Sequence, residues 1–529
     1  MRIEAAIEDL EAAPVRTLSD RRKFTIFLVM AVGQFMALLD IQIVVASLSS
    51  IQGGLSASQD EIDWVQTAYL MAEIVMIPLS AYLAQALSTR WVFAASAALF
   101  TTTSLVCGAA WDLQTMVVCR AIQGFVGGAM IPLAFATGFQ FFDGKRAAAA
   151  TAVLGVVSTL APSLGPAIGG WITEALGWRW LFFVNIAPGA LVAIALIALG
   201  PYEQARPGLL LRIDWLHAAS MATFLGGLQY VLQEGPTHEW LSNAKVAAVA
   251  WVTLVAGLVF AERCVYSPRP LVDLKPFRHR GFGPACVLCF VVGFTIYTSV
   301  YLTPLFLAEV RDFSSLDIGL TVFIAGLSMT VAAGPAAALA ARIDLRLLMS
   351  VGLLIYAVSF WMLSKLGPEW GFWQLFLPQA VRGFAVLFSM VSVVGMALRD
   401  MPEESLLDAS GLNNLMRNLG GAVGIALTTT WLIDFGNLHA ASLARAFGGG
   451  SNEATIAAVG LGTRFLGDGA DPGAARQMAT ATLMSGVQAQ ALTLAFDDVF
   501  RIIAIVSLAA LAVVPFCRAG PLTQGPRGH

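Results

Sequence analysis

Charged side chains are scarce in this sequence. Only 12% of the 529 residues are Asp, Glu, Lys or Arg, whereas 57% are hydrophobic, and the mean hydropathy is +0.75. These proportions lie far outside the range of soluble globular proteins and indicate a polytopic membrane protein. The net charge is -3 and no long basic run occurs, so the composition gives no support for nucleic-acid binding.

Cysteine and histidine are also few. Cys286 and Cys289 form the only CxxC pair, and because it lies in an apolar run, packing is favoured over redox or metal chemistry. No nucleophile elbow or phosphate-binding loop occurs. These absences disfavour a membrane-embedded enzyme or a receptor, and no cofactor or metal is expected. The five histidines lack metal-ligand spacing: His217, His238, His279, His439 and His529.

Long apolar runs recur along the chain. A bilayer core about 30 Å thick needs about 20 apolar residues per helix. The polar segment 1–23 precedes such a run without a cleavage site, so we interpret the run as an uncleaved first transmembrane helix. The sequence therefore predicts an all-α membrane protein with 14 spans. They are 24–47, 62–83, 91–110, 114–141, 147–173, 180–199, 215–232, 244–264, 282–308, 317–341, 347–365, 371–398, 408–433 and 498–517.

The distribution of Lys and Arg predicts the orientation of these spans. An even number of spans places both termini on one side of the membrane. If that side is the cytoplasm, the inside segments hold 20 Lys and Arg and the outside segments hold 7. Both termini, including the tail 518–529, are therefore expected to be cytoplasmic.

An internal repeat relates the early and late spans. The stretch "AIQGFVGG" is similar to "AVRGFAVL", so that Gly124 corresponds to Gly383 at an offset of 259 residues. The same offset aligns Gly165 with Gly424. Repeats of this kind are typical of secondary transporters, whose substrate path lies at the interface of the repeated halves.

The repeat predicts the domain organisation. Two six-helix halves cover residues 24–200 and 282–517, and residues 201–281 add two transmembrane helices with flanking cytoplasmic loops. The outside connection 434–497 is exceptionally long; its first part is rich in glycine, and 474–495 has a helical pattern. A docking or gating role and a passive surface loop are both open for this connection.

Three charged residues within the spans are candidates for proton coupling, because charge at membrane depth is costly. Asp40 and Glu73 come from adjacent antiparallel spans, and counting from the span ends places them within about two turns in depth. Arg120 is followed by Gln123, Gly124 and Gly128, and a positive charge at this place would favour proton release from a nearby acid. The alternatives are a structural hydrogen bond for Asp40 and a structural ion pair for Arg120.

The stretch "APSLGPAIGG" is unusual for a membrane helix. Pro162 and Pro166 each lack a backbone donor, and they share one helix face with Gly155 and Gly169. The pattern predicts a bent helix with a smooth face that packs tightly and opens at a hinge. The remaining glycines of the motif are Gly165 and Gly170.

Together these motifs resemble the major facilitator superfamily, specifically its fourteen-helix drug:proton antiporters of the EmrB/QacA type. "GVVSTLAPSLGPAIGGWI" is similar to the antiporter motif of that family and "RAIQGFVGGAM" to its arginine motif. "LLDIQIVVASL", "WRWLFFVNIAPG" and "ASGLNNLMRNLGGAVG" are similar to stretches of the EmrB branch. One departure concerns the loop after the second span, where the family usually has a glycine and an aspartate. This sequence has Ala81 and Gln85 there and keeps Arg90, which puts the usual charge relay in doubt.

The resemblance implies a proton-driven exporter of amphipathic small molecules in the bacterial inner membrane. It implies a major facilitator fold, alternating access, and in Gram-negative relatives a periplasmic adaptor and an outer-membrane channel as partners. An exporter of one endogenous metabolite, such as a siderophore or a fatty acid, is the alternative on the same scaffold.

Several side chains are candidates for the lining of a substrate cavity, although plain packing is the alternative for each. These are Gln34, Phe35, Met36, Tyr69, Tyr297, Tyr301, Asn413 and Arg417.

Overall fold

The computed structural model describes residues 18–522 except 201, 202, 204, 268, 269, 449–463, 465–470 and 519. This part of the chain is built of helices joined by short connections, with no strand in it. The first 17 residues, most of the glycine-rich part of the 434–497 connection, and the last seven residues lie outside the described part.

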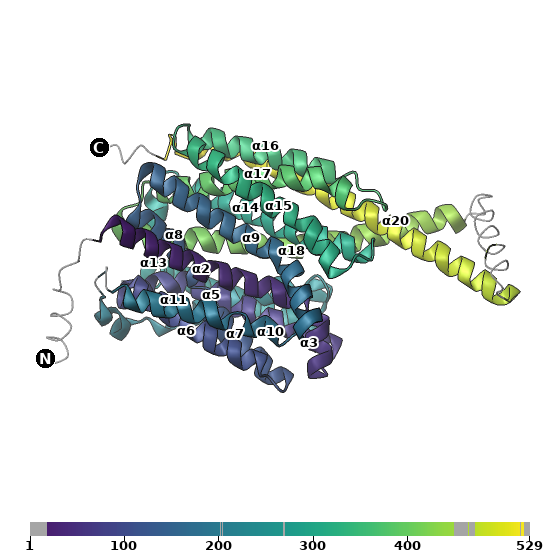
Figure 1. Ribbon diagram of the computed structural model, residues 1–529, viewed down its shortest axis with the longest axis horizontal. Coiled ribbons are helices and arrows are strands. Elements are labelled where there is room, and N and C mark those ends of the chain that lie inside the picture. Colours follow the sequence, from purple (N-terminus) through teal and green to yellow (C-terminus); the bar gives the residue numbers. More distant parts are fainter. Residues whose placement is uncertain are drawn as a thin grey trace.

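The helices before residue 200 form the first set, which is drawn in purple and blue in Figure 1. The predicted fourth span is divided, because α7 ends at Gly127 and α8 begins at Met130. The helices of this set are α2 (Asp20–Ala46), α3 (Leu48–Leu55), α4 (Gln59–Ile62), α5 (Trp64–Leu87), α6 (Thr89–Gly108), α7 (Leu113–Gly127), α8 (Met130–Phe141), α9 (Gly144–Leu176), α10 (Trp180–Phe183) and α11 (Ile186–Ala198).

The helices after residue 281 form the second set, drawn in teal, green and yellow. They are α14 (Phe282–Glu309), α15 (Ser315–Ala340), α16 (Leu345–Leu363), α17 (Phe372–Leu398), α18 (Glu403–Gly448) and α20 (Pro472–Ala509), followed by the short helices η4 (Ala510–Ala512) and η5 (Val514–Phe516). The two sets lie side by side, and α9 of the first packs along α15 of the second (Figure 1).

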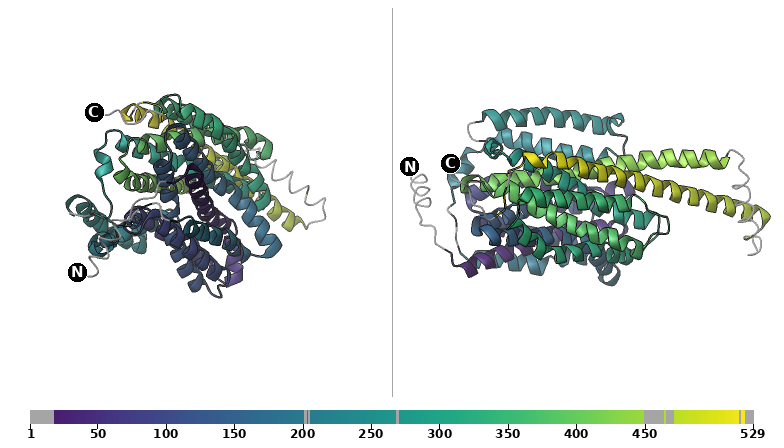
Figure 2. Two further views of the ribbon diagram at one scale, coloured as in Figure 1. Left: turned by 60° about the vertical axis from the view of Figure 1, so that its left-hand side comes forward. Right: turned by 90° about the horizontal axis from the view of Figure 1, so that it is seen from above.

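Two further helices lie along one side of the bundle (Figure 2, right). They are α12 (Trp215–Glu234) and α13 (Ala244–Tyr266), flanked by the short helices η1 (Pro207–Arg212), η2 (Trp240–Ser242) and η3 (Lys275–Arg278). α12 packs against α5 of the first set, against α18 of the second set, and against α13 on its outer side. α12 therefore contacts both sets.

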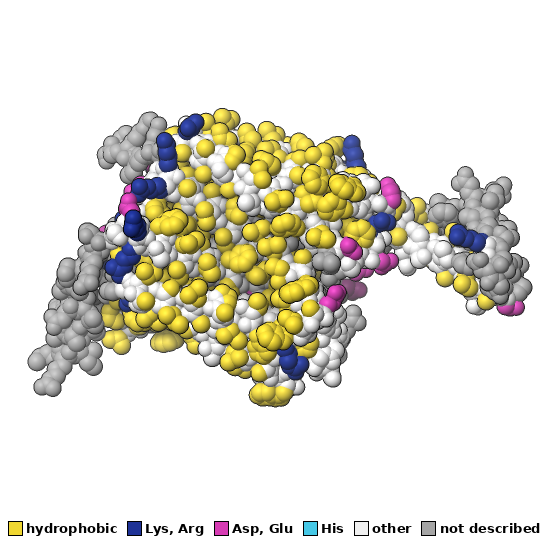
Figure 3. All heavy atoms as spheres, viewed as in Figure 1, with side chains coloured by type: hydrophobic (Ala, Val, Ile, Leu, Met, Phe, Trp, Pro, Cys, Tyr) yellow, Lys and Arg dark blue, Asp and Glu magenta, His cyan; other side chains and the backbone are white. Residues whose placement is uncertain are grey.

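Each of the fourteen predicted spans coincides with helix. In the described part of the chain, twelve helices are long and apolar enough to cross a membrane; α9 and α12 are not among the twelve. Hydrophobic side chains cover the flank of the bundle, and Lys and Arg gather at the end where α2 begins (Figure 3). The all-α, multi-pass membrane fold is thus confirmed. We call the end where α2 begins and α15 ends the terminal end.

The connection 434–497 differs from the expected loop. α18 continues as one helix of 46 residues to Gly448, and α20 runs for 38 residues from Pro472. The helical pattern expected for 474–495 is confirmed. The two helices project as an antiparallel pair beyond the bundle (Figure 1). We call this pair the hairpin, and the end of the bundle from which it projects the hairpin end. Helix therefore extends further into this connection than the sequence pattern predicts, because α18 and α20 pack against each other there.

Candidate functional site

Asp40 and Arg120 form an ion pair inside the first set of helices. Nη1 of Arg120 lies 2.5 Å from Oδ2 of Asp40, and both side chains are fully buried. The Asn185 side-chain amide donates to Oδ1 of Asp40 at 2.6 Å, and Gln123 donates to the same oxygen at 3.3 Å. Arg120 also donates to the side-chain oxygen of Gln123 at 2.8 Å and to the carbonyl of Val65 at 3.3 Å. Neutral amides and a backbone carbonyl thus complete the surroundings of the pair.

The two glycines that follow Arg120 bring α5 against this ion pair. A Cβ atom on Gly124 would collide with the carbonyl oxygen of Tyr69, and one on Gly128 with the carbonyl oxygen of Glu73. The small residues therefore allow the close backbone approach that their spacing predicts. As a result the guanidinium carbon of Arg120 lies 4.2 Å from the centre of the Tyr69 ring, a favourable cation–π position.

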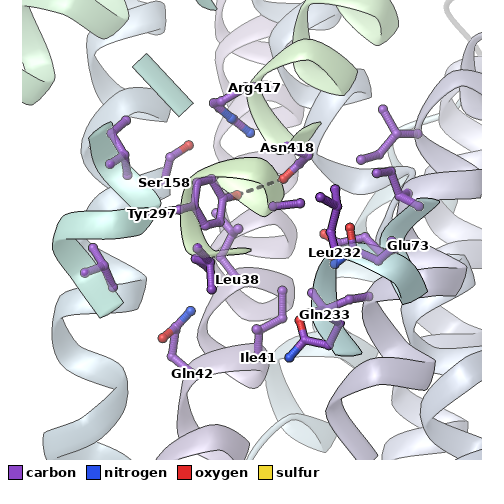
Figure 4. A pocket seen from close by; sticks show the side chains of 18 of the residues that line it. Leu38, Ile41, Gln42, Glu73, Ser158, Leu232, Gln233, Tyr297, Arg417 and Asn418 are labelled. Carbon is purple, nitrogen blue, oxygen red and sulfur yellow. Dashed lines mark hydrogen bonds between the residues drawn. The ribbon is translucent and has the colours of Figure 1, made fainter. Parts of the chain in front are cut away.

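A cavity lies between the two sets of helices (Figure 4). It encloses about 1030 Å³, part of it open to solvent, and its lining is mainly apolar. The first set contributes residues of α2, α5 and α9, and the second set contributes residues of α14, α17 and α18. An apolar cavity with a few polar groups is the usual form of a small-molecule site.

The lining of this cavity includes one acidic side chain, Glu73, and one basic side chain, Arg417. Glu73 is only 6% exposed, and it has no hydrogen-bond or ion-pair partner within the described residues. Arg417 is 4% exposed and donates to the side-chain oxygen of Asn414 at 2.5 Å. Beside it, the hydroxyl of Tyr297 donates to Asn418 at 2.8 Å (Figure 4). The cavity thus has an acidic side on α5 and a basic side on α18.

Asp40 and Glu73 occupy different environments. Leu38, Ile41 and Gln42 of α2 line the cavity, whereas Asp40 lies on the other face of the helix, in the buried cluster with Arg120. The structure therefore brings Asp40 and Arg120 together and leaves Glu73 facing the cavity.

The predicted cavity residues divide into two groups. Tyr297 and Arg417 line the cavity. The others do not. Gln34 donates to Ser158, a lining residue, at 2.8 Å, Tyr301 accepts from Thr429 at 3.4 Å, and Asn413 contacts the Cys289 thiol. Met36 and Tyr69 are buried, and Phe35 packs on the hydrophobic core.

The glycines of the antiporter motif contact different partners along α9. A Cβ on Gly155 would meet Leu387 of α17, whereas Cβ atoms on Gly165 and Gly169 would meet Gln42 and Ile43 of α2. Gly170 is buried and Pro166 is partly buried; Pro162 lies within the same helix, and its side chain is outside the described part. The smooth face therefore packs against the second set near the cavity and against α2 toward the hairpin end.

Gln85, one of the two residues that depart from the family's loop motif, joins the two sets of helices at the terminal end. The Gln85 side-chain amide donates to Oδ2 of Asp408 at 3.0 Å, from α5 to α18. Nearby, the hydroxyl of Ser410 donates to the carbonyl of Pro132 at 2.8 Å. Arg90 is buried, and its guanidinium donates to the carbonyl of Ile197 at 3.5 Å. A neutral amide thus takes part in an inter-helix contact where the family usually has an aspartate.

α9 and α15 approach each other closely toward the hairpin end. A Cβ on Gly319 would collide with Ala167 of α9. The cavity therefore lies between this contact on one side and the contacts of Gln85 and Ser410 on the other.

Sequence reasoning missed several polar residues of the site, among them Asn185, Gln229 and Gln233. Asn185 is the second side-chain amide at the ion pair, beside Gln123, and Gln229 and Gln233 of α12 line the cavity. All three are uncharged polar residues inside or at the edge of predicted spans. A polar residue inside a span can indicate a functional site, but a charged residue there is the stronger indication. The sequence analysis therefore selected the carboxylates.

Comparison with known proteins identifies the family. The profile of the Major Facilitator Superfamily matches residues 30–425. The colistin resistance protein EmrB of Acinetobacter baumannii is 35% identical over 94% of this chain and 96% of its own length. The multidrug export protein EmrB of Escherichia coli K12 is 27% identical over 92% of this chain and 94% of its own.

Solved structures support the fold. The human organic anion transporter MFSD10 superposes with a TM-score of 0.57 at 15% identity, covering 93% of this chain and all of that one. The proton:xylose symporter XylE gives a TM-score of 0.56 at 13% identity, covering 94% of this chain and 95% of its own. The chain therefore belongs to the major facilitator superfamily of transporters and, within it, to the EmrB type.

Proposed function

We propose that this protein exports amphipathic small molecules in exchange for protons, by alternating access between the two sets of helices. Two observations carry the proposal. Glu73 faces an apolar cavity and has no hydrogen-bond or ion-pair partner among the described residues, and Asp40 and Arg120 form a buried ion pair in the same set of helices. The names of the relatives from A. baumannii and E. coli support multidrug export.

In the proposed cycle, Glu73 and Asp40 are the protonation sites. A proton on Glu73 removes its negative charge from the cavity and weakens the hold on a cationic or donor-bearing substrate. A proton on Asp40 removes the charge that balances Arg120, so that α2 and α7 lose an ion pair and can separate. The glycine face of α9 would then act as the hinge and seal between the two states.

The proposal includes the place and the partners of the protein. The excess of Lys and Arg at the terminal end supports a cytoplasmic location of that end in a bacterial inner membrane. The hairpin would then project into the periplasm, where it offers a surface to an adaptor and, through it, to an outer-membrane channel. Deletion of the hairpin beyond the bundle should then abolish resistance in cells and spare transport in liposomes; equal loss in both assays would count against the partner proposal.

Gradient-driven transport in liposomes tests the central proposal. Wild-type protein should move an amphipathic dye under an imposed pH gradient, and adding dye should release protons. Glu73→Gln and Asp40→Asn should abolish both signals, whereas Glu174→Gln, which neutralises an exposed acid on α9, should leave them intact. Unchanged proton release in both variants would overturn the residue assignment, and a wild-type protein that moves nothing would overturn the function.

Export of one endogenous metabolite is a second candidate. The fatty acid resistance protein FarB of Neisseria gonorrhoeae is 29% identical over 75% of this chain and 78% of its own length, and it supports a fatty acid as cargo. Arg417 in the cavity offers a partner for a carboxylate. A susceptibility panel and metabolite profiling of a deletion strain would separate the two candidates.

A further inference from the structure

The cavity has a third wall that belongs to neither set of helices. Gln229, Leu232 and Gln233 of α12 line it. Leu232 and Gln233 lie on the side where Glu73 of α5 faces the cavity (Figure 4), and Gln229 is one helical turn from Gln233 on the same face of α12. α12 is one of the two helices inserted between the sets, so its contribution lies outside the repeated scaffold.

Contacts to both sets hold α12 in this place. On the first set, the ring of Tyr230 lies 5.8 Å from the ring of Trp64. On the second set, the indole of Trp240, in the connection after α12, donates to the hydroxyl of Thr430 of α18 at 3.1 Å. α12 therefore covers the seam between α5 and α18, and its inward face is fixed against the cavity.

Three polar side chains in this part of the cavity, Glu73, Gln229 and Gln233, are buried or partly buried and have unused hydrogen-bonding groups. Glu73 and Gln229 are each 6% exposed, and Gln233 is partly buried. None of the three side chains has a hydrogen-bond partner among the residues that the structure describes. All three line the cavity, so their acceptor oxygens are available to a ligand that enters it.

We propose that Glu73, Gln229 and Gln233 form a subsite for the cationic, hydrogen-bond-donating head of the substrate, such as a protonated primary amine. A carboxylate and two amide oxygens offer acceptors for the three N–H donors of an ammonium group. Arg417 lies at the α18 side of the cavity, so the positive head is directed away from it and toward α5 and α12. The apolar body of the substrate then lies along side chains such as Ile296 and Ile425. The inserted helix thus selects the substrate by its head group. This inference deepens the proposed export function and rests on it.

Equilibrium binding to the purified full-length protein tests the subsite without any gradient. The probes are an aromatic amphiphile with a primary ammonium group and its neutral hydroxyl analogue. Replacing both glutamines, Gln229→Leu with Gln233→Leu, should weaken binding of the amine about ten-fold or more, because hydrogen bonds to a charged group are lost. Binding of the hydroxyl analogue should change by less than about two-fold. Thr223→Leu, at an exposed position of α12 that does not line the cavity, should change neither.

Gln233→Glu provides the opposite test. The added carboxylate should tighten binding of the amine and leave the hydroxyl analogue unchanged, which a merely destabilised α12 could not produce. Equal changes for both probes, or none for either, would overturn the subsite. Because binding is read without a pH gradient, a wild-type protein that binds the amine through α12 yet transports nothing would disprove the export function and leave the subsite standing.

Discussion

Arg382 donates a hydrogen bond of 3.0 Å to the backbone carbonyl of Ser299, the residue that the internal repeat aligns with Asp40. The same offset aligns Arg382 with Gln123, and Arg120 with Gln379. The two halves of the repeat therefore carry an arginine and a glutamine three residues apart in reversed order. In the second set the arginine donates to a carbonyl where the first set supplies a carboxylate. Both halves thus keep a buried arginine, and among the described residues only that of the first set is paired with an acid.

The buried ion pair predicts a large and rescuable loss of stability. Asp40→Asn leaves the Arg120 charge buried without its partner, which should destabilise the protein by about 3 to 5 kcal/mol. Adding Arg120→Gln should recover part of that loss, because no uncompensated charge remains. Thermal unfolding in detergent measures both.

Asp20 and Arg146 provide the matched control for this prediction. They also form an ion pair, with 2.9 Å between Oδ2 and Nη1, but the two side chains are 73% and 69% exposed. Asp20→Asn should therefore cost no more than about 1 kcal/mol. Equal losses for Asp20→Asn and Asp40→Asn would show that burial does not govern the strength of these pairs.

The contact of α9 and α15 predicts that the hairpin end opens when it is crowded. Gly319→Leu forces a side chain against Ala167, at a cost of about 1 to 3 kcal/mol to this closed arrangement. Gly334→Leu lies on the same helix at a position with nothing within 4 Å of its added Cβ, and serves as control. Labelling of a cysteine at Ser158 from the hairpin end should rise for Gly319→Leu only; equal labelling of the two variants would contradict the contact.

The Gln85–Asp408 hydrogen bond predicts that a second negative charge at this contact opens the terminal end of the bundle. Gln85→Glu places two carboxylates at this contact, and their repulsion should weaken closure by about 1 to 4 kcal/mol. Labelling of a cysteine at Ser158 from the terminal end should therefore increase. Restoring one neutral partner, as in Gln85→Glu with Asp408→Asn, should return labelling to the starting level. A double variant that labels like Gln85→Glu alone would rule out the contact as a latch.

The proline and glycine stretch of α9 predicts variants that impair coupling more than folding. Pro166→Ala restores a backbone donor and should stiffen the helix, and Gly165→Leu should push α9 from α2, because even a Cβ there overlaps Gln42. The measurements are the amount of protein in the membrane and the number of substrate molecules moved per proton. Either variant reaching the membrane and transporting normally would show that the bend serves architecture alone.

The class of fold and the positions of the spans could be predicted from the sequence. Apolar runs of spanning length suffice for this, because in lipid the backbone must satisfy its hydrogen bonds within helices. The close approach of α7 and α8 to α5 was also predictable, since Gly124 and Gly128 are separated by one helical turn. Likewise, Arg120 needed a buried partner whatever its neighbours were.

Which acid pairs with Arg120 could not be predicted, because it depends on how the helices pack. Counting along the spans places Asp40 and Glu73 within about two turns in depth, which does not tell them apart. The rotation of α2 and α5 about their axes places Asp40 in the ion pair and Glu73 at the wall of the cavity. The same holds for Gln229 and Gln233, because no pattern along the sequence tells which set of helices an inserted helix packs against. The hydrogen bond of Gln85 could not be predicted either, since its partner Asp408 lies more than 300 residues away in the sequence. Spans follow from local composition, whereas these pairings depend on helix rotation and on long-range packing, and the folded bundle alone fixes both.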